Sequence, residues 1–270
     1  MTILRNGLYL TIILLLTSAV SAKVQSQVIQ GEEIEEFLRQ AEITAAKTLD
    51  VGITAPKKLT MVRNGETRYA IFKVVDEYKA LMKFDDGRMD MNFQDSWKSE
   101  IAAYEIDKIM ELGMVPATLE RTYRGQKGSV QFWVDSMMTE LEHKDKKVVS
   151  PDPEKFNREM YKTRVFDNLV FNTDRNLRNL LITKEWELVL IDHSRAFRPQ
   201  HLLKSSKDLE RFSLSMLEGL KKLNQKNLTE KAGKYLPKNQ IEGLLKRRDL
   251  ILELAKKLEA QKGADAVYYP

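Results

Sequence analysis

The 270-residue sequence contains no cysteine and few of the residues that interrupt regular structure, with 12 glycines and 7 prolines. Without cysteine the chain has no disulfide, no thiolate nucleophile, no lipobox acylation and no cysteine-ligated zinc. The three histidines, His143, His193 and His201, lack the spacing of metal ligands, which argues against a histidine zinc site. Stability must therefore come from the packed core.

Long runs of one charge are also missing, although the formal net charge is +5. Lysine and arginine alternate with aspartate and glutamate, which is typical of a solvated surface. No nucleic-acid-binding module is recognisable, so we expect no nucleic-acid partner.

The only long apolar run lies at the N-terminus. Arg5 precedes the run 8–16, and the small residues of 17–22 follow it. This order predicts a signal peptide, residues 1–22, that is cleaved after Ala22 and directs a secreted or periplasmic protein. The run is shorter than the roughly 20 residues of a membrane span. A retained anchor is the alternative, and only in that case do we expect membrane contact.

Hydrophobic periodicity predicts the elements of the N-terminal half. Apolar residues at helical spacing predict an amphipathic helix over 31–46. The Asn64-Gly65 dipeptide between strand-like runs predicts a hairpin of strands 58–62 and 67–75. The polar segment through Asp85-Asp86-Gly87 is predicted to be a flexible loop.

The second half is predicted to be mainly helical. A helix from Ser96 to Leu112, capped by Asp95 or Ser96 and ended by Gly113, leads into it. The later elements are a strand at 129–138, a polar connector that begins at 139–142, a helix over 154–171 opened by Pro153, a strand pair at 180–182 and 188–191, and helices over 205–261 with breaks near Asn227 and Pro237.

Two aspartates and an asparagine follow the long helix of the second half. Asp174 and Asn179 have Asp-x-x-x-x-Asn spacing, so one tight loop can present both. Asp192 ends four consecutive apolar residues, where a carboxylate is costly unless it is paired or metal-bound. A turn or capping role is the alternative explanation for Asp174. A purely structural role explains Asp192 less well than Asp174.

Two further charged residues precede this loop in the order that phosphoryl transfer requires. Lys73 lies on a predicted strand with apolar flanks, and Glu100 lies on the next helix. A cation on the nucleotide phosphates, an acid that holds it and metal ligands are the parts of a kinase site. An edge-strand lysine and a first-turn glutamate stabilised by the helix dipole are the alternatives, and Glu105 is the second candidate for the acid.

These residues carry a resemblance to a known family. The segments 70–73, 99–108, Val115-Pro116, 173–176 and 191–197 are similar to the secretory-pathway atypical kinases of the Golgi casein kinase type. They are more distantly similar to phosphatidylinositol kinases and HipA-like kinases. The resemblance implies Lys73 on the phosphates with Glu100 as its partner, Asp174 as catalytic carboxylate, Asp192 with Asn179 on the metal, and Glu140 and Leu141 at the adenine.

Three features depart from that family. No Gly-x-Gly-x-x-Gly loop precedes Lys73, and Gly52–Pro56 is the only candidate for the roof over the nucleotide. Asn176 stands where those families often have histidine. Animal secretory kinases are rich in disulfides, whereas this chain has none.

The combined prediction is an α+β protein with a two-lobed, protein-kinase-like fold. The N-lobe has an antiparallel sheet and one main helix, and the C-lobe is mostly helical. We expect ATP and Mg or Mn as cofactors and a hydroxyl acceptor on a protein, sugar, polyol or lipid headgroup. A pseudokinase that serves as a binding module and a nucleotidyl transferase on the same fold are the alternatives. The predicted parts are 1–22 signal peptide, 23–57 helix and linker, 58–140 N-lobe, and 141–270 C-lobe.

Overall fold

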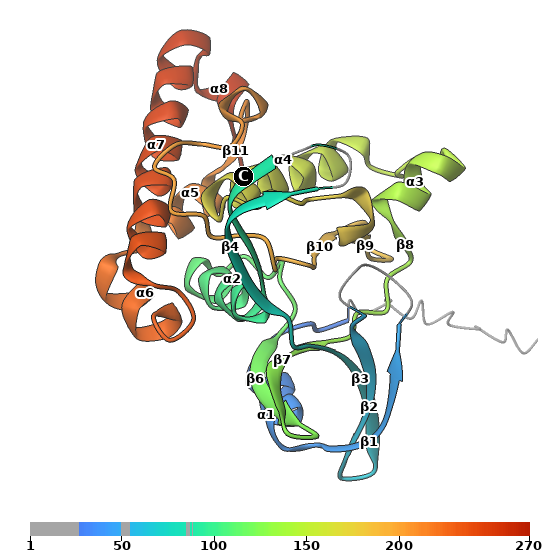
Figure 1. The fold of residues 1–270 in the computed structure, drawn as a ribbon. Helices are drawn as coiled ribbons and strands as arrows, with labels where there is room; N and C mark the ends of the chain where they lie inside the picture. The colour runs from blue at the N-terminus through green and yellow to red at the C-terminus, as the bar shows by residue number, and fades with distance from the viewer. Residues whose placement is uncertain (1–26, 50–54, 85–86, 88) are drawn as a thin grey trace, which may run out of the picture.

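The computed structural model describes residues 27–49, 55–84, 87 and 89–270. Figure 1 shows a β-rich lobe with α1 and a larger, mostly helical lobe, as the sequence predicts for an α+β chain. The predicted signal peptide and most of the predicted roof, residues 52–54, lie outside the described residues. Within the described ranges, no helix is both long and apolar enough to cross a membrane.

The N-lobe is built on a five-stranded antiparallel sheet with the order β1-β2-β3-β7-β6. The predicted hairpin is present as β2 (Lys57–Arg63) and β3 (Glu66–Lys73), and it turns at Asn64 and Gly65. Both turn residues have positive φ, at 51° and 79°, which is the conformation that favours asparagine followed by glycine. The other three strands are β1 (Glu42–Thr48), β6 (Thr118–Tyr123) and β7 (Gln126–Phe132).

The helix predicted over 31–46 is wrong in its second half. The helix α1 (Glu32–Gln40) ends early, and β1 (Glu42–Thr48) then pairs antiparallel with β2. Side chains of β1 are mostly exposed, so backbone pairing rather than side-chain burial holds this strand. The curved sheet wraps around α1 in Figure 1, and α1 buries Ile34, Phe37 and Leu38 in the core. This pairing makes β1 part of the lobe.

The loop predicted to run through Asp85-Asp86-Gly87 is wrong in its first part, and Asp85 and Asp86 themselves lie outside the described residues. The chain instead forms a long hairpin of β4 (Asp76–Lys83) and β5 (Met89–Ser96) that runs beside the C-lobe (Figure 1). Every residue of β4 except Met82 is exposed, so the strand has no apolar alternation by which it could be predicted. Buried Arg198 anchors the hairpin by donating to the carbonyls of Met91 and Asn92 and to the Asp90 carboxylate.

The helix α2 (Trp97–Met110) joins the lobes and begins where the sequence predicts. The hydroxyl of Ser96 caps it by accepting from the Lys98 amide at 3.2 Å. The helix ends at Met110, two residues earlier than predicted, and Glu111 takes the left-handed cap conformation at φ 57°. Gly113, predicted to end the helix, lies beyond the cap with φ 71°. The helix packs against β7 on one side and against α5 and α6 on the other. It therefore fixes the orientation of the lobes.

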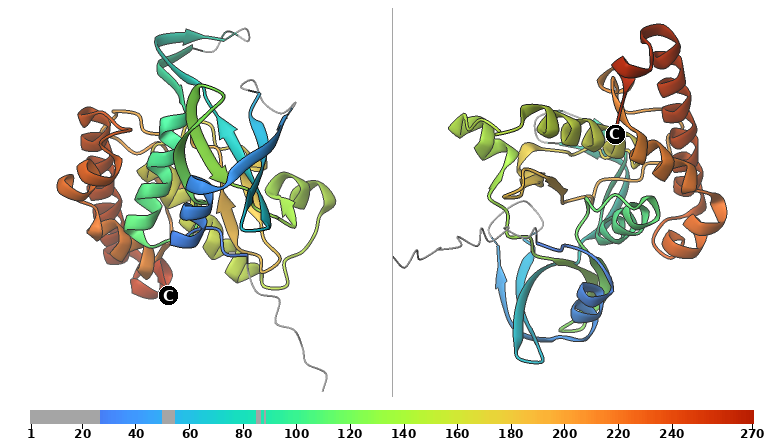
Figure 2. Two further views of the ribbon diagram at one scale, coloured as in Figure 1. Left: turned by 90° about the horizontal axis from the view of Figure 1, so that it is seen from below. Right: turned by 180° about the vertical axis from the view of Figure 1, so that it is seen from behind.

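The C-lobe places a small sheet, β10-β9-β8, against its long helices. Figure 2 shows α3 and α7 on opposite flanks of this lobe. Its elements are β8 (Met138–Thr139), α3 (Glu140–Lys146), α4 (Pro153–Leu169), η1 (Leu177–Asn179), β9 (Leu180–Ile182), β10 (Leu188–Leu190), η2 (Ser206–Asp208), β11 (Phe212–Ser213), α5 (Leu214–Lys222), α6 (Gln225–Ala232), α7 (Lys238–Lys262), α8 (Ala264–Val267) and β12 (Tyr268–Tyr269).

Two predicted boundaries in this lobe need correction. The strand expected over 129–138 stops at Phe132, and the chain crosses between the lobes at 133–137. The helical break expected near Asn227 lies at Leu223, because Asn224 caps α6 and Asn227 completes its capping box. The break at Pro237 is placed correctly, at the start of α7.

Candidate active site

Lys73 and Glu100 meet between the two lobes. Lys73 is the last residue of β3, and its Nζ lies 2.5 Å from Oε1 of Glu100, in the first turn of α2. The Glu100 side chain is 1% exposed, so this is a buried ion pair rather than a solvated first-turn glutamate. Glu105, the second candidate, instead lies within 4.0 Å of Lys108.

The same lysine reaches Asp192. Lys73 Nζ lies 2.7 Å from Asp192 Oδ1. The side-chain amide of Asn179 donates from Nδ2 to Asp192 Oδ2 at 3.2 Å. Asp192 follows β10 with φ 60°, a left-handed conformation that aspartate tolerates better than most residues. The amide of His193 donates to Glu100 Oε2 at 3.0 Å. Four residues that are distant in sequence thus form one cluster.

Electrostatics keep Lys73 and Asp192 ionised. Burial disfavours the Lys73 ammonium, but Glu100 and Asp192 outweigh burial and raise its pKa. Burial alone would raise the pKa of Asp192, but the attraction of Lys73 outweighs burial and lowers that pKa to about 2. Burial raises the pKa of Glu100 against the pull of Lys73. Asp192 is therefore a carboxylate at any physiological pH.

Arg175 organises the loop that carries these groups. Its guanidinium pairs with Asp167 of α4 at 3.0 Å and donates to the carbonyls of Asn179 and Ile191 at 3.1 and 2.5 Å. It also donates to His193 Nε2 at 2.9 Å. One buried arginine therefore holds Asn179 itself and the residues on both sides of Asp192.

We expect Arg175→Met to destabilise the fold by about 3–5 kcal/mol, because it leaves Asp167 buried and unpaired. The side chains of Arg175 and Asp167 are 8% and 10% exposed. Urea unfolding monitored by circular dichroism measures the change. Arg178→Met, on the exposed side of the same loop, is the matched control and should change the free energy of unfolding by no more than about 0.5 kcal/mol.

His193 is buried as a neutral ring. Because arginine only donates, Nε2 of His193 must accept from Arg175, which leaves the ring proton on Nδ1. Burial, reinforced by Arg175, lowers the pKa of His193 well below its usual value. The ring sits edge-on to Phe166, at 5.8 Å between centroids, so it belongs to the core of the loop.

This neutral histidine predicts a pH-dependent stability. The unfolded chain binds a proton at His193 below about pH 6.5 and the folded chain does not, so the free energy of unfolding falls as the pH drops through that value. His193→Gln should reduce the slope of stability against pH between 5 and 6.5 by up to about 1.4 kcal/mol per pH unit. Thermal unfolding at several pH values tests it, with exposed His201→Gln as control. Equal slopes in wild type and His193→Gln would contradict a buried neutral ring.

Asp174 lies at the exposed edge of the same loop. Its carboxylate, 52% exposed, pairs with Arg195 Nη1 at 3.2 Å, and its amide donates to Asn172 Oδ1 at 3.1 Å. Arg195 also reaches Asp95 of β5 at 3.4 Å. Asp174 is thus tied to the segment that begins with Asp192, with its carboxylate open to solvent.

Glu140 and Leu141 lie in the first turn of α3, beyond the connector 133–137. The Glu140 carboxylate is buried and pairs with His143 Nδ1 at 2.9 Å and with Lys144 at 3.7 Å. The Glu140 carboxylate thus binds residues of its own helix, α3. Contact of these two residues with adenine stays a prediction, and the connector is the segment that directly bridges the lobes.

The side chains present suit a hard divalent cation. Mg²⁺ in kinase sites is held by one or two carboxylate or amide oxygens together with phosphate oxygens and waters. Asp192 and the adjacent Asn179 offer such groups beside the Lys73 ammonium. In the described part of the chain, no cluster of three histidine or acidic residues forms a metal cage, so the phosphates would have to complete the coordination.

Comparison with solved structures relates the fold of this chain to known proteins. No protein-family model matches the sequence, and no curated protein matches it. Solved structures do match. The hydra Fam20 structure with sugar covers 87% of this chain and 91% of its own, with a TM-score of 0.62 and 15% identity. The fold is that of the Fam20-type atypical kinases.

Two other kinases share this fold. The Golgi casein kinase structure matches 87% of this chain and 76% of its own, with a TM-score of 0.59 and 14% identity. The structure of the proinflammatory kinase CtkA of Helicobacter pylori matches 82% of this chain and 97% of its own, with a TM-score of 0.52 and 14% identity. The two-lobed, protein-kinase-like fold predicted from the resemblance to the Golgi casein kinase type is confirmed, whereas the chemical roles of the site residues stay predictions.

Sequence reasoning missed two contacts of the site. Asp95 is predicted only as a possible helix cap, yet it pairs with Arg195 across the lobes. For His193 the sequence analysis argues only against a zinc site, yet the ring is wholly buried against Arg175. Neither contact has a local sequence signal, because Asp95 and Arg195 are 100 residues apart and Arg175 and His193 are 18 residues apart.

Proposed function

We propose that the protein is a metal-dependent phosphotransferase that moves the γ-phosphoryl group of ATP to a hydroxyl acceptor. The observation that carries this proposal is the convergence of Lys73, Glu100, Asn179 and Asp192 at one point between the lobes. Ordered cation, acid and metal ligands suit a reaction in which catalysis is mainly positioning and charge neutralisation. The kinase fold of the structural neighbours supports it.

Each residue has a distinct role in this proposal. Lys73, oriented by Glu100, neutralises the nucleotide phosphates. Asp192 and Asn179 hold Mg or Mn, which supplies charge stabilisation to the phosphoryl group when bound. Asp174 orients the acceptor hydroxyl, since its carboxylate is exposed at the edge of the loop.

We further propose that the reaction takes place outside the cytosol, because residues 1–22 have the pattern of a signal peptide. The acceptor is proposed as a hydroxyl of a sugar, polyol, protein or lipid headgroup. The hydra Fam20 neighbour, whose structure contains sugar, makes sugars the first class to test.

Mass spectrometry of products tests the proposed function directly. Purified protein is incubated with ATP, Mn²⁺ or Mg²⁺ and a panel of sugars, polyols and a casein-type protein. A mass increase of one phosphate on an acceptor, or on the protein itself, is expected only when metal is present. Addition of a nucleotide would instead identify nucleotidyl transfer. Absence of metal-dependent nucleotide binding would leave a pseudokinase as the remaining function of this fold.

A further inference from the structure

The carboxylate of Asp174 has one side-chain partner among the described residues. Its Oδ2 pairs with Arg195 Nη1 at 3.2 Å, and the rest of the side chain is open to solvent. An aspartate without such a partner is free to adopt any of its staggered rotamers. The direction in which the Asp174 carboxylate points therefore depends on Arg195.

The Arg195 side chain is itself held by β5. Its Nε lies 3.4 Å from Asp95 Oδ2, and the Asp95 side chain is 10% exposed. The guanidinium also lies over the ring of Phe93, 5.2 Å from its centroid. A planar guanidinium that is held by an acid at one edge and by a ring at its face has little freedom to move. Arg195 is thus a fixed support and not a mobile surface arginine.

The backbone on both sides of Arg195 is held by the same strand. The amide of Ser96 donates to the Ser194 carbonyl at 2.9 Å, and the side-chain amide of Gln94 donates to the Ala196 carbonyl at 3.4 Å. These contacts do not involve the Arg195 side chain. They fix the place from which that side chain reaches Asp174.

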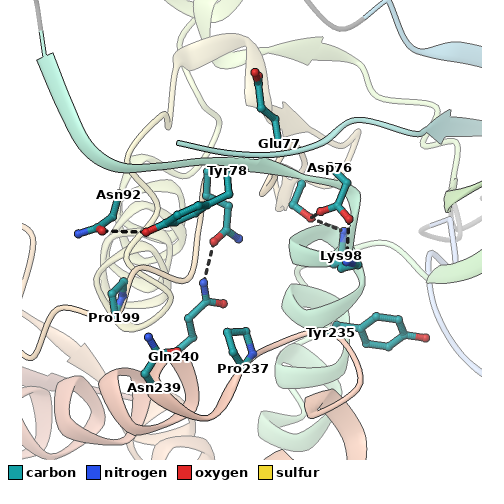
Figure 3. A pocket seen from close by; sticks show the side chains of 12 residues that line it. Asp76, Glu77, Tyr78, Asn92, Lys98, Pro199, Tyr235, Pro237, Asn239 and Gln240 are labelled. Atoms are coloured by element: carbon teal, nitrogen blue, oxygen red, sulfur yellow. Dashed lines mark hydrogen bonds and ion pairs between the residues drawn. The ribbon is translucent and has the colours of Figure 1, made fainter. Parts of the chain in front are cut away.

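The end of β5 that carries these contacts is tied to two helices. Asp76, at the start of the paired strand β4, pairs with Lys98 of α2 at 2.6 Å. Gln240 of α7 donates to Gln94 at 2.7 Å. Both contacts lie in the wall of the pocket shown in Figure 3. The support of Arg195 therefore extends into the body of the C-lobe.

Two other roles for Arg195 fit the structure less well. An arginine that binds a phosphate, or an acidic group on the acceptor, uses positive charge that no protein group has neutralised. Arg195 already faces two carboxylates, those of Asp95 and Asp174, and its side chain is only 20% exposed. Its charge is therefore balanced within the protein.

We propose that Arg195 is a positioning residue, which holds the Asp174 carboxylate toward the acceptor hydroxyl and is held in place by Asp95. This inference rests on the proposed role of Asp174 in phosphoryl transfer. A misplacement of about 1 Å in a reacting group can cost about 100-fold in rate. The contribution of Arg195 and Asp95 is therefore to the rate of transfer and not to nucleotide affinity.

Initial rates of product formation and nucleotide titrations test the two residues. Arg195→Met should lower kcat about 10–100-fold and leave ATP affinity within about twofold. Arg195→Lys keeps the charge without the planar fork and should recover part of that loss. Asp95→Asn should lower kcat about 3–10-fold, although Asp95 makes no contact with Asp174 among the described interactions.

The same variants in an Asp174→Asn background show whether they act through Asp174. Arg195→Met and Asp95→Asn should then lower the residual rate by no more than about twofold, because the carboxylate that they position is already absent. Arg39→Met is the matched control, since it removes an arginine from an exposed pair with Glu35 in α1. It should leave kcat within about twofold.

Crystal structures of the wild type and Arg195→Met give a readout that does not need activity. The Asp174 carboxylate should occupy one rotamer in the wild type and several in the variant. One unchanged rotamer, or an undiminished effect of Arg195→Met in the Asp174→Asn background, would overturn the inference. Absence of transfer by the wild type, with the expected change of rotamer, would contradict the proposed function and leave Arg195 as the residue that orients Asp174. If Arg195→Met does not fold, the double variant with Asp95→Asn replaces it, because it leaves no unpaired charge at Asp95.

Discussion

Replacing Asp192 with asparagine is expected to abolish metal-dependent nucleotide binding while the fold survives. Among the described residues, Asp192 is the one carboxylate that contacts both Lys73 and Asn179, and its pKa is about 2, so it carries the full negative charge that a divalent cation requires. Loss of residues that only support metal ligands costs about 10–100-fold in affinity, so removal of a ligand should cost at least about 100-fold. Fluorescence titration with a nucleotide analogue, with and without Mn²⁺, measures the effect.

The residue that replaces Asp192 decides whether the loss of charge is accompanied by backbone strain. Asp192 has φ 60°, where alanine is strained by roughly 1–2 kcal/mol, whereas asparagine tolerates the conformation. Asp192→Asn thus removes charge with little backbone strain, and Asp192→Ala should show the same loss of metal-dependent binding at lower stability. Asp265→Asn, at an exposed position of α8, is a control for the loss of one negative charge. Unchanged metal and nucleotide affinity in Asp192→Asn would remove the metal role from this residue.

Local sequence signals were sufficient where a single short segment decides the structure. The Asn64-Gly65 turn, the Ser96 cap of α2 and the Pro153 start of α4 were predicted, because each follows from turn or capping chemistry within a few residues. The pairing of β1 with β2 was not predicted. Ala45 and Ala46 fit a helix locally, and only a partner strand elsewhere in the chain makes them extended.

The same distinction separates the parts of the site. The order of Lys73, Glu100 and Asp192 is a property of the sequence, and it predicted that these residues would meet. The pair between Asp95 and Arg195 depends on the β4–β5 hairpin lying against the C-lobe. That hairpin has almost no buried side chains in its first strand, so hydrophobic periodicity could not indicate it. Its position comes from tertiary contacts, chiefly those of Arg198.

Removal of the Asp174 carboxylate is the second change with a large expected effect. Asp174→Ala should lower the rate of phosphoryl transfer about 10²–10⁴-fold, the usual contribution of a positioned acid or base, and should leave ATP affinity within about twofold. The separation is expected because Asp174 makes no contact with Lys73 or Asn179 among the described interactions, and its side chain is 52% exposed to solvent. Initial rates of product formation and nucleotide titrations on the same preparation provide both quantities.

We expect the Asp174 variants to stay folded, so that a change in transfer rate reports on catalysis and not on stability. Asp174 loses a partly exposed pair with Arg195, which is worth at most about 1 kcal/mol. Arg195 keeps Asp95 as a partner, so the variant leaves no unpaired buried charge. Asp174→Asn tests whether the carboxylate itself is required, since it retains the shape and the turn chemistry of the loop. Transfer at the wild-type rate in both variants would exclude Asp174 from catalysis, whereas loss of ATP binding in both would make it part of the nucleotide site instead.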